Sequence, residues 1–171
     1  MADLTLAWLG AGATVGLLAL SAFFSSAEMA IFSLPVEWVR ERAAAGDERA
    51  AALAALHDDP HRLLVTVLVG NNVVNVAISS VVTVVAVTYA SPGVAVTVAT
   101  LLVSSVVLVF GEIVPKSYGL GHAREWALTV ARPVTLVERG LSPLVSVFDA
   151  VTRRINARIG ADSHIEEPYV E

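Results

Sequence analysis

Three long apolar stretches dominate the pattern of hydrophobic and polar positions along the chain, at residues 4–32, 63–89 and 94–118. A helix needs about 20 apolar residues to cross the hydrocarbon core of a bilayer, and each stretch is long enough. Charges are rare inside them: Glu28 is the only one in the first stretch, and the second has none. The pattern therefore predicts three transmembrane helices.

The segments that flank these stretches are helical by pattern but carry many charges. Residues 34–56 are predicted to form two short helices separated by Gly46. Ser33 is placed to cap the first of them and Asp47 the second. Charged residues and prolines interrupt residues 124–159, among them Arg132, Pro133, Glu138, Arg139, Pro143 and Asp149. Burying such charges in hydrocarbon would cost several kcal/mol each. These segments are therefore predicted to be amphipathic helices that lie in the membrane interface.

The distribution of basic residues predicts the orientation. All 11 Lys and Arg residues lie within residues 40–62 and 116–158. With three spans, these two regions fall on the same side of the membrane, which the positive-inside rule makes the cytoplasmic side. The expected protein is a multi-pass protein of the cell membrane, with its N-terminus outside and its C-terminus in the cytoplasm.

Composition narrows the class of protein. Of the 171 residues, 56% are hydrophobic and only 16% are charged, with a mean hydropathy of +0.70. Soluble domains carry about 25% charged residues, so the chain has too little polar surface for a water-soluble globule. The net charge of −5 argues against a nucleic-acid partner, and the absence of cysteine excludes disulfides and thiolate metal sites. One transmembrane domain, residues 1–160, is expected, closed by Gly160 and followed by an acidic tail at residues 161–171.

Each apolar stretch has one polar face. At about 100° per residue, the polar residues of a stretch fall within about 100° of one another or less. The three faces consist of Ser21, Ser25 and Glu28, of Asn71, Asn72, Asn75 and Ser79, and of Ser105 and Glu112. At about 1.5 Å per residue, they lie near the bilayer midplane or in its inner half. They are therefore placed to converge.

Pro115 adds a further oxygen to this set. A proline inside a helix cannot donate to the carbonyl four residues back, which here belongs to Gly111, beside the Glu112 carboxylate. Glycine also lets a partner approach its backbone closely. Hydroxyl, amide, carbonyl and carboxylate oxygens are hard ligands, which suit Mg²⁺, Ca²⁺ or Na⁺ rather than Zn²⁺ or copper.

Other roles compete for these polar residues. Ser and Asn in membrane helices often only bond to neighbouring helices, and we assign Ser104 and Ser105 to packing. Glu28 lies close to the inner boundary, where it is better placed to pair with a basic residue. An intramembrane enzyme is disfavoured, because no His, Cys or second carboxylate accompanies Glu112.

Three motifs together resemble the transmembrane domain of the CNNM/CorC family of magnesium transporters. They are Leu-Ser-Ala-Phe-Phe-Ser-Ser-Ala-Glu-Met-Ala (20–30), Leu-Val-Gly-Asn-Asn-Val-Val-Asn (68–75) and Gly-Glu-Ile-Val-Pro-Lys (111–116), and the amphipathic, proline-containing segment follows them. The resemblance covers nearly the whole chain. The cation ligands that the resemblance to this family implies correspond here to Ser21, Ser25, Asn71 or Asn72, Asn75, Gly111 and Glu112.

The resemblance also implies an architecture and a function. The fold is an all-α integral membrane homodimer, in which each protomer has three transmembrane helices and a cytoplasmic-side belt of juxtamembrane helices. The function is Mg²⁺ export, coupled to Na⁺ entry. Family members usually continue into CBS-type regulatory modules. Such a module is expected in the full-length protein but is absent from these 171 residues, so regulation by a nucleotide is not carried over. The alternative is a cation-sensing membrane anchor that transports nothing itself.

The predicted topology is testable with single cysteines, because the chain has none of its own. Ser91→Cys, between the second and third stretches, should react with a membrane-impermeant thiol reagent added outside the cell. Arg49→Cys should react only after the membrane is permeabilised. The opposite labelling pattern would overturn the orientation.

Overall fold

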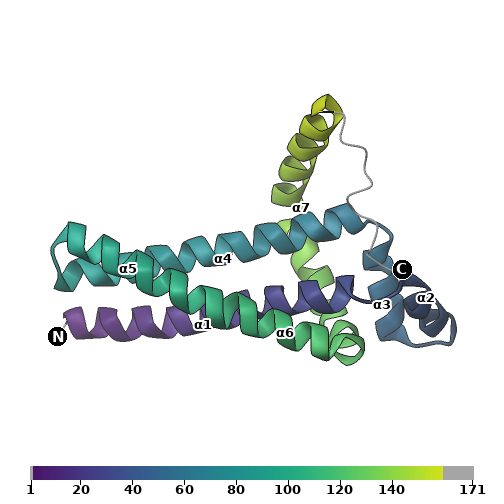
Figure 1. The fold of residues 1–171 in the computed structure, drawn as a ribbon, viewed down its shortest axis with the longest axis horizontal. Helices are drawn as coiled ribbons and strands as arrows, with labels where there is room; N and C mark the ends of the chain where they lie inside the picture. Colours follow the sequence, from purple (N-terminus) through teal and green to yellow (C-terminus); the bar gives the residue numbers. More distant parts are fainter. Residues whose placement is uncertain (1, 160–171) are drawn as a thin grey trace. The chain divides into compact units, whose positions relative to one another are not determined.

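The computed structural model describes residues 2–159, and all of its regular structure is helical (Figure 1). The prediction of an all-α protein is confirmed for these residues. Gly160 and the acidic tail lie outside the described residues. The elements are α1 (Ala2–Phe32), α2 (Val36–Ala44), α3 (Glu48–His57), α4 (Pro60–Tyr89), α5 (Pro92–Val106), the π-helix η1 (Val107–Ile113), α6 (Val114–Gly121) and α7 (Ala123–Ile159).

Three helical stretches are long and apolar enough to cross a membrane, as the sequence predicted: Leu4–Phe32, Pro60–Tyr89 and Pro92–Gly121. The second is rich in valine and threonine, which favour strands in water. In hydrocarbon, however, every backbone N–H and C=O must be bonded within its own segment, which a helix achieves. The last stretch comprises α5, η1 and α6 in succession.

The described residues fall into two compact units. The first unit contains residues up to 26 together with residues 71–118, and the second contains residues 27–70 together with those from 119 onward. The first unit therefore holds the N-terminal part of α1, the C-terminal part of α4, and α5, η1 and most of α6. The second unit holds the segments that the sequence predicts to lie in the membrane interface.

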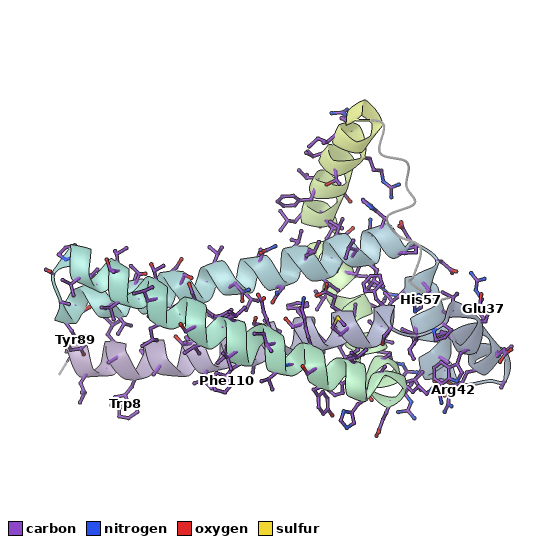
Figure 2. All side chains as sticks on the ribbon, viewed as in Figure 1. Trp8, Glu37, Arg42, His57, Tyr89 and Phe110 are labelled. Carbon is purple, nitrogen blue, oxygen red and sulfur yellow. The ribbon has the colours of Figure 1, made fainter. Side chains whose placement is uncertain are left out.

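One end of the first unit is closely packed and rimmed by aromatic side chains. A β-carbon on Gly10 of α1 would collide with Val85 of α4, so glycine lets these two helices approach each other. Trp8 and Tyr89 lie exposed at this end (Figure 2). Exposed Trp and Tyr near the ends of apolar helices are typical of a membrane–water boundary.

The short helices of the second unit end and begin at identifiable residues. Gly46, at φ +93°, follows α2 in the left-handed conformation that glycine tolerates best. The Asp47 carboxylate then caps α3 by accepting from the amides of Arg49 and Ala50 at 3.0 and 3.3 Å, as predicted.

The prediction that Ser33 caps the helix that follows it, α2, is wrong. Its hydroxyl donates backward to the Ala30 carbonyl, at 3.2 Å. The N-cap position of α2 is instead Pro35, which offers no side-chain cap. The physical reason is that proline disfavours helical geometry in the residue before it. The chain therefore stays non-helical through Leu34, and α2 begins only at Val36.

Helix α7 packs against α4 through apolar contacts and an ion pair. Val145 is fully buried and clusters with Val65 and Val69. Beside them, Arg62 Nε lies 2.5 Å from Glu138 Oε1, and its Nη2 donates to the Ser142 hydroxyl at 3.0 Å. These partners lie within α7, a single helix that continues through Pro133 and Pro143.

Two side chains near α3 have shifted pKa values. Burial lowers the pKa of His57 below its usual 6.5, and the positive charge of Arg40 lowers it further, against the opposing effect of Asp58. Neutral His57 thus suits the fold, so the stability it contributes is present above pH 6.5 and is lost as the pH falls through the lowered pKa. The hydrogen bond from Arg42 similarly lowers the pKa of Asp47.

The partly buried Arg62–Glu138 pair should matter more for stability than an exposed pair on the same helix. Glu138→Gln leaves the Arg62 charge only partly exposed and without a carboxylate partner, so we expect a loss of about 1–2 kcal/mol, between the values typical of surface and buried pairs. The control is Glu48→Gln, which removes the 2.7 Å ion pair between Glu48 and Arg132. Their side chains are 84% and 60% exposed, respectively. That loss should be below about 0.5 kcal/mol. Equal losses in thermal unfolding in detergent would contradict the assignment.

Candidate cation-binding site

Hydrogen bonds join polar side chains from all three spans within the first unit. The Ser21 hydroxyl of α1 lies 3.0 Å from Asn71 Oδ1 and 2.8 Å from Asn75 Oδ1, both of α4. The Asn75 amide nitrogen in turn donates to Glu112 Oε1 of η1, at 3.2 Å. The polar faces predicted on separate helices therefore meet at one place.

The cluster holds more oxygen lone pairs than protons. A serine hydroxyl has one proton, so Ser21 can donate to only one of its two amide oxygen partners at a time. The Asn75 amide cannot turn to relieve this without losing its bond to Glu112, because its nitrogen faces that carboxylate. With the Asn71 amide oriented as it is here, three oxygens, from Ser21, Asn71 and Asn75, share the single hydroxyl proton of Ser21. A cation placed among them would be attracted to all three.

Ser25 lies one helical turn from Ser21 and is also fully buried. Among the described residues, its hydroxyl has no hydrogen-bond partner. Serines elsewhere in the spans satisfy their hydroxyls by donating to the carbonyl four residues back, as Ser79 and Ser105 do. A buried hydroxyl without a partner costs about 1–3 kcal/mol, so Ser25 is a group that a ligand would stabilise.

The helix widens where Glu112 is located. In η1 the Val114 N–H donates to the Val109 carbonyl, five residues back, which is the π-helical register. The next donor in the series would be residue 115, but Pro115 has no N–H. It can bond neither the Phe110 carbonyl in the π register nor the Gly111 carbonyl in the α register. The sequence predicted an α-helix interrupted by this proline, and the structure adds the π-turn before it.

Gly111 lets η1 approach α1 closely. A β-carbon there would lie 2.8 Å from Ser21 Oγ and 3.4 Å from Val107 Cγ1. The first distance is shorter than any ordinary carbon–oxygen contact, so a larger residue would displace the Ser21 side chain. The sequence suggested that glycine admits a partner to its backbone. In the described structure, the nearest group is the Ser21 hydroxyl.

A cavity of about 320 Å³ opens beside Asn75 and Glu112. It is lined by Asn75, Ser79, Val103, Ser104, Val107, Leu108 and Glu112. The sequence predicts a packing role for Ser104, because serines in membrane helices often only bond to neighbouring helices. Ser104 and Ser79 nevertheless line the same cavity as Glu112.

The structure thus groups most of the residues predicted as ligands. Ser21, Asn71, Asn75, Gly111 and Glu112 come together, and Ser25 is buried one turn away. Of the two alternatives, Asn71 reaches Ser21, whereas Asn72 is exposed. Glu28 belongs to the second unit. No group of three or more His, Cys, Asp or Glu side chains suited to a metal occurs in the described part of the chain, so any cation here would depend on neutral oxygens around one carboxylate.

Comparisons with known proteins identify relatives of the chain. Residues 12–171 match the model of the cyclin M transmembrane N-terminal domain, CNNM. A UPF0053 inner membrane protein of Escherichia coli is 32% identical over 147 residues, which are 85% of this chain and 34% of that protein. A chloroplastic DUF21 domain-containing protein of Arabidopsis thaliana is 37% identical over 155 residues, 90% of this chain and 23% of that protein. A UPF0053 protein of Haemophilus influenzae is 33% identical, over 90% of this chain and 36% of its own length.

Two substitutions test whether the backbone around Gly111 contributes to cation binding. Pro115→Ala restores an N–H that can bond the Phe110 or Gly111 carbonyl, and we expect Mg²⁺ affinity to fall about 5- to 30-fold, or 1–2 kcal/mol. Gly111→Ala should displace Ser21, weaken binding and cost about 1–3 kcal/mol of stability. Gly12→Ala, where a β-carbon meets nothing within 4 Å, is the matched control. Thermal unfolding at increasing Mg²⁺ measures both effects, and parent-like binding by both variants would exclude a role for this backbone.

Proposed function

Since this chain belongs to the cyclin M transmembrane domain family, we propose that it is the membrane domain of a divalent cation transporter that carries Mg²⁺. The family is generally associated with divalent cation transport. The observation that carries the proposal is the convergence of three oxygens, from Ser21, Asn71 and Asn75, next to the Glu112 carboxylate.

The chemistry of these ligands favours Mg²⁺ as the cargo. Magnesium prefers oxygen ligands, gives up its water reluctantly and usually keeps several waters when it is bound by one or two carboxylates. One carboxylate with neutral oxygens offers such a site, and the adjoining 320 Å³ cavity has room for the retained water. A single negative charge also keeps the affinity modest, which suits a site that must release its ion.

Direction and coupling extend the proposal. We propose export of Mg²⁺ driven by Na⁺ entry, in a homodimer embedded in the lipid bilayer. Na⁺ is also a hard cation, so the same oxygen-rich surroundings can accept it. Asn72, Ser79 and Ser104 are exposed on the single chain. Polar groups at membrane depth are costly to leave in lipid, which supports a second copy as their cover.

The second candidate is a cation-sensing anchor that binds Mg²⁺ and regulates a partner without transport. This chain spans about a third or less of the length of the curated relatives that it matches. Their remaining length is therefore large enough to contain the partner that such a sensor would regulate. Both candidate functions use the same cation site, but only the transporter moves Mg²⁺ across the membrane. Mg²⁺ uptake into proteoliposomes, with and without an opposing Na⁺ gradient, distinguishes them: binding without flux would favour the sensor.

Glu112→Gln tests the site itself. It keeps the side-chain shape but removes the formal charge, so Mg²⁺ affinity measured by calorimetry should fall by more than about tenfold, the loss expected for one charge-assisted ligand. Stability without the ion should hold or rise, because a carboxylate no longer lies within the spans. Ser105→Ala, from the same span, is the control, since that hydroxyl only donates to the Leu101 carbonyl. Unchanged binding by Glu112→Gln would remove Glu112 as a ligand.

A further inference from the structure

A second cavity, of about 500 Å³, lies entirely within the second unit. One wall consists of residues 33–35, directly after α1, and the other of residues 120–125, from the end of α6 into the first turn of α7. Leu34, Pro35 and Leu120 make part of the wall apolar, whereas Arg124 and Glu125 contribute opposite charges. None of these residues belongs to the candidate cation site.

The position of this cavity along the spans places it at a membrane boundary. Two of the three apolar helices end at Phe32 and Gly121, and each wall begins within one residue of these ends. Residues that directly follow the end of a span lie at the level of the lipid headgroups, whichever side of the membrane that is. A cavity at this level, with both apolar and charged walls, is open to lipid.

Among the described residues, neither charge of the cavity has a side-chain partner of opposite sign. Arg124 lies over the Trp38 ring, 5.7 Å from its centre, and Arg42 lies over the same ring at 5.6 Å. The ring thus holds the Arg124 guanidinium in place without neutralising it. Within residues 2–159, neither Arg124 nor Glu125 forms an ion pair with another side chain.

The start of α7 adds donors beside Arg124. The Trp126 N–H bonds to the His122 carbonyl at 2.9 Å, which makes it the first ladder bond of this 37-residue helix. The amides of residues 123–125 therefore precede the ladder and have no partner within it. Backbone N–H groups at a helix start favour phosphate oxygens, and an arginine fork binds them in pairs.

We propose that this cavity binds the headgroup of a zwitterionic glycerophospholipid with a primary amine, such as phosphatidylethanolamine. Arg124 and the first-turn amides of α7 hold the phosphodiester, and Glu125 accepts from the ammonium group. Leu34, Pro35 and Leu120 contact the less polar part of the lipid. The paired charges distinguish this lipid from an anionic one, because a headgroup with no cation would leave Glu125 facing a negative phosphate.

The test uses the full chain in detergent after delipidation. Phosphatidylethanolamine, phosphatidylcholine, phosphatidylglycerol and inorganic phosphate are each added, and bound lipid is counted by native mass spectrometry alongside the unfolding temperature. We expect phosphatidylethanolamine to be retained most and to raise the unfolding temperature most. Phosphatidylcholine should bind less, because its quaternary ammonium cannot donate a hydrogen bond to Glu125.

Single substitutions test which residue binds the phosphodiester and which binds the ammonium group. Arg124→Gln should weaken retention of phosphatidylethanolamine by about tenfold, as expected for the loss of a charge-assisted contact. Glu125→Gln leaves Arg124 on Trp38 and should abolish the preference for phosphatidylethanolamine over phosphatidylglycerol. Arg139→Gln, an exposed arginine of α7 outside the cavity, should change neither. Mg²⁺ binding by all three variants should match the parent, which separates this proposal from the cation site.

Several results would overturn the proposal. Stabilisation by inorganic phosphate equal to that by the lipid would assign the cavity to a free anion. An equal loss in Arg139→Gln and Arg124→Gln would mean unspecific attraction of lipid to a basic helix. A preference for phosphatidylethanolamine that survives Glu125→Gln would remove the ammonium contact. If Arg124→Gln fails to fold, the result for Glu125→Gln still decides the headgroup selectivity.

Discussion

A polar group inside a bilayer has no water to bond, and the structure of the three spans depends on how each such group is satisfied. Most serine and threonine hydroxyls donate to the carbonyl four residues back, so they impose little on the tertiary structure. Ser21 instead bonds Asn71 and Asn75 of another helix, and Ser25 bonds no described residue. These groups remain available to a cation because the helix backbone does not satisfy them.

The backbone of the third span is adapted to the same place. The π-turn of η1 changes the direction of each side chain after it by changing the number of residues per turn, and it carries Glu112. Gly111 provides the space that the Ser21 side chain occupies, and Pro115 removes the donor that would close the ladder. Each feature costs helix stability. Together they are typical of a functional site, where such costs are offset by the contacts of a ligand or of the surrounding fold.

Charged side chains near the ends of the spans differ in whether the described residues supply a partner of opposite charge. Arg62 and Glu138 pair where both side chains are largely covered, next to the buried Val145, and so link the start of α4 to α7. Arg124 and Glu125, at the start of α7, form no such pair within the described residues. At a membrane boundary, lipid headgroups supply charges of both signs, which gives such residues a partner that the protein does not provide.

The sequence by itself determined the helical class, the three spans, the Asp47 cap and the polar faces, because these depend on hydrophobic length, on local hydrogen bonding and on helical periodicity. Tertiary structure decided what periodicity leaves open. Asn71 and Asn72 are neighbours in sequence, and only the position of α1 selects Asn71 for Ser21. The failed Ser33 cap, by contrast, follows from Pro35, which the sequence shows. The π-turn and the presence of Ser104 in the cavity that Glu112 lines depend instead on backbone geometry and on contacts between segments, which composition and residue spacing do not encode.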